Sequence, residues 1–103
     1  MKTTVIGAGA WGTALARLIY LSEGEVCLWG RNIDSLFTLE CKGKNERYLP
    51  DIDLPVGIPT QSNLLEAVKK ADCLVLAVPS NAFREITTHL SNFSGVVVSV
   101  TKG

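Results

Sequence analysis

Short apolar runs of strand length alternate with amphipathic segments of helical length along this chain, and the alternation starts at the first residues. Short β-branched or apolar runs between turn signals are typical of buried strands, whereas apolar positions three and four residues apart are typical of helices. The pattern predicts strands at 3–6, 25–29, 73–78 and 96–100, with a short edge strand near Ile58. It predicts helices at 11–21, 32–41, 63–70 and 80–90.

Side chains that can cap a helix occur at two of the predicted helix starts. Asn63 and Glu66 have the spacing of a capping box, and either Asn32 or Asp34 can cap the preceding helix. Segment 42–60 holds three prolines and two glycines, so we expect a long ordered loop there. The boundaries of the helices are therefore better defined than the course of this loop.

Large apolar side chains suggest how the elements pack. One face of the first predicted helix carries Trp11, Leu15, Leu18 and Ile19. Three aromatic residues are interpreted as core or core-edge positions: Trp29, Phe37 and Phe93. Alternation of strands and helices specifies a parallel sheet with helices on both faces. We expect an α/β, Rossmann-type doubly wound fold with strand order 3-2-1-4-5, formed by residues 1–103 as one domain.

A glycine-rich turn lies between the first strand and the first helix. The segment reads G-x-G-x-x-G and comprises Gly7, Ala8, Gly9, Ala10, Trp11 and Gly12. In that context Gly7 permits the tight turn, Gly9 lets the backbone approach a pyrophosphate, and Gly12 lets the helix pack close to the sheet. The amide groups and the positive end of the helix dipole can then receive the pyrophosphate of a dinucleotide. A glycine-rich turn without a ligand is the alternative.

The end of the second strand bears on the choice between NAD and NADP. NAD sites usually carry an acidic residue there, which binds the ribose 2′-hydroxyl. This chain has no carboxylate at that place and has Arg31 instead. A guanidinium can pair with the 2′-phosphate of NADP and stack on adenine, so NADP is favoured over NAD as the cofactor, and use of both dinucleotides is an alternative. A surface arginine that faces water is the alternative.

The composition argues against nucleic-acid binding, membrane insertion and a cysteine-ligated metal site. Ten basic residues balance ten acidic ones, so no long-range field attracts nucleic acid or an acidic membrane. No stretch approaches the roughly 20 apolar residues that span a bilayer, and no membrane insertion is expected. The three cysteines form no metal-binding spacing and indicate reduced thiols in a cytoplasmic protein. His89, Arg47 and Arg84 are interpreted as surface groups, although Arg47 can help to order the loop near the cofactor.

Five ordered segments resemble bacterial NAD(P)-dependent glycerol-3-phosphate dehydrogenase. They are residues 5–16 around the glycines, Leu28-Trp29-Gly30-Arg31, the N-x-x-R-Y-L-P segment from Asn45 to Pro50, Ala77-Val78-Pro79-Ser80, and Thr101-Lys102-Gly103. The resemblance covers essentially the whole chain. It implies an enzyme that interconverts sn-glycerol 3-phosphate and dihydroxyacetone phosphate for glycerophospholipid synthesis, commonly as a homodimer.

The resemblance also implies roles for individual residues. The cofactor-binding set is Gly7, Ala8, Gly9, Ala10, Trp11, Gly12, Arg31, Tyr48, Pro79 and Lys102. Lys102 is expected to contact the phosphorylated substrate as well. Ala10 and Thr101 each stand where the family usually has serine, so Ala10 retains only its backbone amide for a contact.

The resemblance implies that most of the catalytic machinery lies elsewhere. The family's catalytic lysine belongs to a following helical domain that this chain lacks, so no catalytic residue and no activity are expected within residues 1–103. Two alternatives remain at this point. One is another dehydrogenase of the superfamily, of the ketopantoate reductase or 3-hydroxyacyl-CoA dehydrogenase type, and the other is a non-catalytic module that senses dinucleotides.

Overall fold

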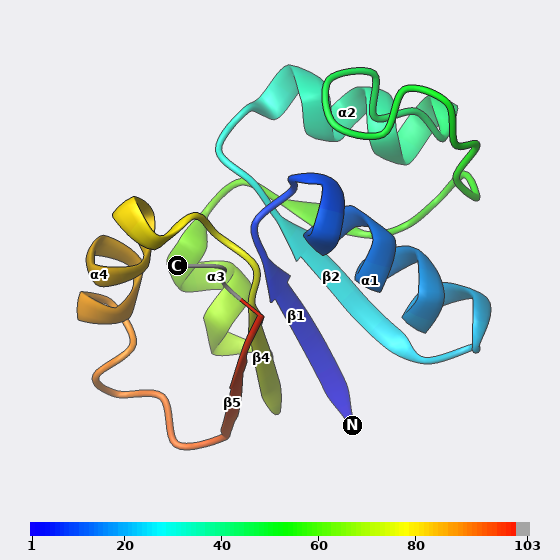
Figure 1. Cartoon of the computed structure of the whole chain (residues 1–103). Helices are drawn as coiled ribbons and strands as arrows, with labels where there is room; N and C mark the ends of the chain where they lie inside the picture. Colours follow the sequence, from blue (N-terminus) through cyan, green and yellow to red (C-terminus); the bar gives the residue numbers. More distant parts are fainter. Residues whose placement is uncertain (101–103) are drawn as a thin grey trace.

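The computed structural model describes residues 1–100 as a parallel β-sheet with helices on both faces (Figure 1). Strands and helices alternate strictly along the chain. Their bounds are β1 Lys2–Ile6, α1 Ala10–Leu21, β2 Glu25–Trp29, α2 Ile33–Lys42, β3 Thr60–Gln61, α3 Leu64–Lys69, β4 Cys73–Leu76, α4 Ser80–Thr88 and β5 Val96–Ser99. No helix within residues 1–100 is long and apolar enough to cross a membrane.

The sheet has the order β3-β2-β1-β4-β5, and every strand pair is parallel. The predicted doubly wound fold and strand order are therefore confirmed. β1 lies at the centre, with Ile6 opposite Trp29 of β2 on one side and Leu76 of β4 on the other. This placement brings the carboxyl ends of three strands together at one edge of the sheet.

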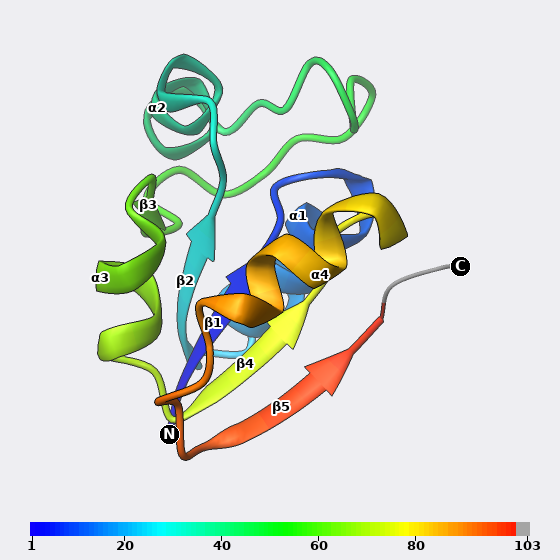
Figure 2. The same cartoon turned by 90° about the vertical axis from the view of Figure 1, so that its left-hand side faces the viewer.

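Successive residues of β1 face opposite sides of the sheet and belong to different cores. Val5 packs with Ala16 of α1 and Leu39 of α2, while Ile6 packs in a second cluster with helices α3 and α4. Both residues are fully buried. Figure 2 shows α1 behind the sheet and α4 in front of it. The continuous apolar character of β1 follows from this burial on both faces.

The predicted apolar face of α1 is buried only in part, since Ile19 packs against the core and Leu15 is half-buried. Its buried residues are Gly12, Thr13 and Ala16, whereas Trp11 and Leu18 are each 60% exposed. Small side chains let the helix axis approach the strands closely, and the large apolar residues then fall on the flank. The expectation for Phe37 was also wrong, because its side chain on α2 is 63% exposed.

The other two aromatic residues occupy core positions as expected. Trp29 is 5% exposed, and its indole Nε1 donates to the carbonyl of Ser62 at 3.1 Å. Phe93 packs against the core cluster beneath α4. Trp29 thus fixes the carboxyl end of β2 against the segment that leads into α3.

Backbone hydrogen bonds tie the loop between α2 and β3 to the end of α2. The amide of Leu54 donates to the carbonyl of Gly43 at 2.9 Å, and the amide of Gly57 donates to Glu40 at 2.8 Å. The edge strand begins two residues after Ile58, which is instead fully buried in the core. Pro59 separates the two, and its carbonyl accepts from the amide of Leu28.

Helix capping follows the sequence closely. The side chain of Asn32 accepts from the amide of Ser35 at the start of α2, so Asn32 rather than Asp34 is the cap. Asn63 accepts from the amide of Glu66 at the start of α3 in the same way. These local bonds explain why both helix starts could be predicted.

Candidate functional site: the glycine loop and its cleft

Gly7 directly follows β1, in a crowded position between the last residue of β2 and the residue that follows β4. Its amide donates to the carbonyl of Trp29 at 2.9 Å, and its φ is +120°. A Cβ atom here would lie 2.4 Å from the carbonyl oxygen of Ala77. Both the backbone conformation and the space therefore require glycine, which agrees with the tight turn expected from the sequence.

The other two glycines of the loop differ sharply in their surroundings. A Cβ atom on Gly12 would lie 1.7 Å from the carbonyl oxygen of Gly7, so α1 rests directly on the turn. A Cβ atom on Gly9 would meet nothing within 4 Å. Gly12 thus serves close packing, whereas Gly9 borders open space that a ligand can approach.

The amino end of α1 is built unlike those of α2 and α3. Its N-cap is Gly9, which has no side chain to accept from the first turn, and that turn has no acidic residue. Asn32 and Asn63 cap the other two helices. A helix start without a polar cap, beside a glycine-rich turn, is suited to an anion such as a pyrophosphate.

A cleft of about 410 Å³ lies at the carboxyl ends of β1, β2 and β4. This edge is where ligands bind in open α/β sheets. The lining includes six residues of the predicted cofactor set: Gly7, Ala8, Gly9, Arg31, Tyr48 and Pro79. Ala10, Trp11 and Gly12 follow in α1 and do not line the cleft. Lys102, assigned to both cofactor and substrate, lies outside the described residues.

Arg31 reaches over the cleft from the end of β2. Its Nη2 atom lies 3.3 Å from Oε2 of Glu85 on α4, and its guanidinium lies 5.9 Å from the ring centre of Trp29. Both charged side chains are more than half exposed. The Arg31 guanidinium thus lies at the mouth of the cleft, where it forms an ion pair with Glu85. The sequence alone did not predict this partner.

Asn45 is a buried residue of this site that the sequence analysis did not assign. Its Nδ2 group donates to the carbonyl of Ala8 at 3.1 Å and to Oγ1 of Thr13 at 2.8 Å. Its Oδ1 atom accepts from the amide of Tyr48 at 3.3 Å. Asn45 therefore fastens the long loop to the glycine turn. The sequence feature that could have pointed to Asn45 is its place as the first residue of the N-x-x-R-Y-L-P segment.

Two exposed residues of the same loop line the cleft beside Asn45. Tyr48 is 48% exposed, and the guanidinium of Arg47 lies 5.3 Å from its ring centre. The interpretation of Arg47 as a surface charge is correct, and the structure adds that it borders the cleft. On the same loop Lys44 pairs with Asp53, which raises the pKa of Lys44 and lowers that of Asp53.

His89 and Arg84 do not belong to the cleft. His89 is exposed and forms the C-cap of α4, as a solvated histidine near a helix end was expected to do. Arg84 is exposed on the same helix. Within residues 1–100, no group of three or more His, Cys, Asp or Glu residues is placed to hold a metal ion.

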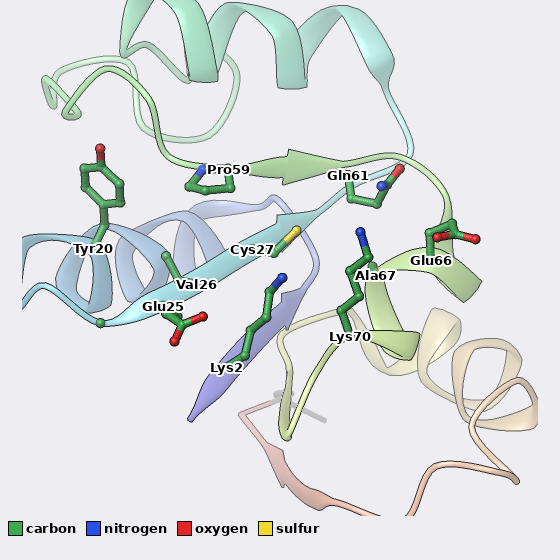
Figure 3. Close-up of a pocket in the computed structure, with 11 residues that line it drawn as sticks. Lys2, Tyr20, Glu25, Val26, Cys27, Pro59, Gln61, Glu66, Ala67 and Lys70 are labelled. Carbon is green, nitrogen blue, oxygen red and sulfur yellow. The ribbon is translucent and has the colours of Figure 1, made fainter.

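A second cavity, of about 300 Å³, lies near the amino ends of β1 and β2. Lys2, Cys27 and Lys70 extend toward it from β1, β2 and the end of α3 (Figure 3). Burial raises the pKa of the Cys27 thiol, and the nearby charge of Lys2 opposes that shift in part. The Cys27 thiol is therefore expected to be a poor nucleophile at neutral pH.

Labelling with a water-soluble thiol reagent at neutral pH should discriminate among the three cysteines. Cys41 is exposed, whereas Cys27 is half-buried and Cys73 is buried. We expect Cys41 to react roughly ten-fold faster than the other two, because only exposed thiolates react readily. Peptide mass spectrometry after timed quenching gives the three rates, and denaturation in urea should make them similar. Equal rates in the folded chain would contradict the burial of Cys27 and Cys73.

Known proteins resemble this chain along its whole length. A family model described as the N-terminus of NAD-dependent glycerol-3-phosphate dehydrogenase matches residues 2–103. Glycerol-3-phosphate dehydrogenase (NAD(P)+) of Bacillus subtilis is 37% identical over 105 residues, which cover 99% of this chain and 30% of that protein. The corresponding enzyme of Xylella fastidiosa strain M23 is 40% identical over 105 residues, with the same coverage of both chains.

A solved structure agrees with these sequence relatives. The crystal structure of glycerol-3-phosphate dehydrogenase from Coxiella burnetii matches with a TM-score of 0.85 at 30% identity. The match covers 99% of this chain and 32% of that one. The chain thus spans about 30% of the length of the curated relatives it matches.

Proposed function

The chain belongs to the family of NAD-dependent glycerol-3-phosphate dehydrogenases, whose N-terminal part it matches, and we propose that its cleft binds NAD(P) with the pyrophosphate at the start of α1. The observation that carries this proposal is the contrast between Gly12 and Gly9. Gly12 is enclosed by close packing against the turn. Gly9 opens onto the cleft at the start of α1, which has no side-chain cap. That arrangement leaves room for a phosphate beside the backbone.

Different residues around the cleft would contact different parts of the dinucleotide. Backbone amides at the start of α1 would face the pyrophosphate, and Asn45 would keep the preceding turn in place through Ala8 and Thr13. Pro79 and Tyr48 would border the bound molecule, since both line the cleft. The nicotinamide, when bound, supplies the hydride chemistry, and the chain contributes binding and orientation.

For the whole protein we propose the interconversion of sn-glycerol 3-phosphate and dihydroxyacetone phosphate, which would supply glycerophospholipid synthesis. The family supports this substrate over those of ketopantoate reductases and 3-hydroxyacyl-CoA dehydrogenases. Residues 1–103 would form the cofactor domain, and a following domain would provide the catalytic lysine and most substrate contacts. Lys102 would meet the substrate phosphate near the cofactor.

Three further parts of the proposal concern the protein in the cell. The free state of all three cysteines agrees with a reducing compartment, so we place the protein in the cytoplasm. A homodimer is proposed for the complete enzyme by analogy with the family.

The 103-residue chain by itself would bind dinucleotide without turning over substrate. Assays of the longer protein with dihydroxyacetone phosphate would separate an enzyme from a dinucleotide sensor.

Arg31 is proposed to favour NADP over NAD by pairing with the 2′-phosphate. Arg31→Asp should therefore remove or reverse a preference for NADPH over NADH. Loss of a charge-assisted bond of about 1.5–3 kcal/mol corresponds to roughly ten-fold or more in affinity. Quenching of Trp11 and Trp29 fluorescence during titration gives both dissociation constants, after circular dichroism has shown a folded chain.

Arg84→Asp is the matched control, because it makes the same charge change on the exposed side of α4 outside the cleft. It should leave the ratio of the two dissociation constants unchanged. If the folded native chain binds neither nucleotide at millimolar concentration, the proposed cofactor site is wrong for this chain. If Arg31→Asp and Arg84→Asp change the ratio equally, the preference reflects overall charge rather than a 2′-phosphate contact.

A further inference from the structure

The Arg31–Glu85 pair joins two sides of the cleft that are far apart in the sequence. Arg31 follows β2, whereas Glu85 lies on α4, which follows β4. Since β1 lies between β2 and β4 in the sheet, the pair spans the carboxyl end of β1. Ala82 lines the cleft and precedes Glu85 by three positions, so both lie on neighbouring parts of one helix face. The Glu85 carboxylate thus lies beside the cleft, where it pairs with Arg31 of the lining.

We propose that Glu85 is a specificity-determining positioning residue that lowers the preference for NADPH by holding the Arg31 guanidinium. The inference rests on the proposed function, in which Arg31 meets the 2′-phosphate. Nη2 of the guanidinium lies 3.3 Å from Oε2 of the Glu85 carboxylate, so the two groups form an ion pair. A 2′-phosphate that approaches Arg31 must compete with this carboxylate and is repelled by its charge.

The same carboxylate does not oppose NADH. A ribose 2′-hydroxyl carries no charge, and carboxylates near the end of β2 are the usual partners of that hydroxyl in NAD sites. This chain lacks such a residue at the end of β2, and α4 brings Glu85 to the neighbouring guanidinium instead. Glu85 therefore shifts the site toward use of both dinucleotides.

The exposure of the pair limits the size of the effect. Side-chain exposures of 58% for Arg31 and 63% for Glu85 mean that water screens their attraction. Exposed pairs of this kind change binding or stability only modestly, so we expect Glu85→Gln to tighten NADPH binding by about three- to five-fold. NADH binding should change by less than about two-fold, since its 2′-hydroxyl does not compete for Arg31.

The test measures dissociation constants for NADPH and NADH with the native chain, Glu85→Gln, Arg31→Gln and the double variant. Glu25→Gln is the matched control, because Glu25 is exposed at the opposite end of β2 and carries the same charge. The expected result is a higher NADPH/NADH affinity ratio for Glu85→Gln alone, with an unchanged ratio for Glu25→Gln. In the Arg31→Gln background, the Glu85 substitution should have a smaller effect on the ratio, because the two residues are coupled.

The outcomes separate this inference from the proposal on which it rests. If Arg31→Gln lowers the ratio but Glu85→Gln leaves it unchanged or lowers it, the site stands and the role of Glu85 is wrong. If Arg31→Gln has no effect on the ratio, or the folded native chain binds neither nucleotide, the proposed role of Arg31 fails and that of Glu85 fails with it. A ratio raised equally by Glu25→Gln would show an effect of net charge and would also overturn the inference.

Discussion

Gly12→Ala is expected to destabilise the fold by about 3 kcal/mol or more, although alanine favours helices. The added Cβ would lie 1.7 Å from the carbonyl oxygen of Gly7 and 3.4 Å from the Cβ of Ala77. The first neighbour is backbone at the end of the central strand, so it cannot rotate away as a side chain could. Either α1 must lift from the sheet or the turn must change its path. Urea denaturation followed by circular dichroism measures the loss in free energy of unfolding.

Gly9→Ala is the matched control for this substitution. Its Cβ would meet nothing within 4 Å, and its φ of −77° is open to any residue, so the free energy of unfolding should change little. The methyl group would instead occupy the space proposed for the pyrophosphate, and we expect roughly ten-fold weaker NADPH binding. Equal stability of Gly12→Ala and the native chain would contradict the close packing of α1 on the turn.

Asn45→Ala is expected to lower the free energy of unfolding by about 2–3 kcal/mol, because it removes three hydrogen bonds that a buried side chain makes. The carbonyl of Ala8 and the hydroxyl of Thr13 would each lose the bond that Asn45 donates and would keep only the 3.3 Å bond between them. The amide of Tyr48 would lose its acceptor, and the loop would no longer be tied to the glycine turn. Urea denaturation measures the stability, and limited proteolysis should show earlier cleavage within 43–59.

Asn92→Ala is the appropriate comparison, since Asn92 is exposed in the segment before β5. The same change of side chain there should alter the free energy of unfolding by less than about 0.5 kcal/mol. If Asn45→Ala behaves like Asn92→Ala in both experiments, the long loop is held by its own backbone bonds, and Asn45 does not order the cleft.

The order of elements could be predicted because its signals are local. Unbroken apolar runs such as that of β4 indicate strands buried on both faces, and Asn32 and Asn63 bond to amides three residues away. The face of α1 could not be predicted from hydrophobicity alone. Close approach to the sheet selects Gly12 and Ala16 for their small size, and that criterion is invisible to a search for large apolar side chains.

The candidate site, too, could be predicted from the sequence only where its features depend on local residues. Glycine spacing after a strand predicted the turn, because the required conformation at Gly7 and the contact at Gly12 act over a few residues. The bonds from Asn45 to the turn and from Arg31 to Glu85 join residues that only the tertiary fold brings together. A sequence can suggest that Arg31 is a cation at the right strand end, but it cannot show which carboxylate competes for it.

β5 is one of the two edge strands of the sheet within residues 1–100, and it pairs there only with β4. Val96, Val97 and Val98 are all exposed on it. An exposed edge strand with β-branched side chains is a template for edge-to-edge association of identical chains. At high concentration, aggregation of this chain would therefore start at β5. The nucleotide cleft, at the ends of β1, β2 and β4, could remain intact within such aggregates.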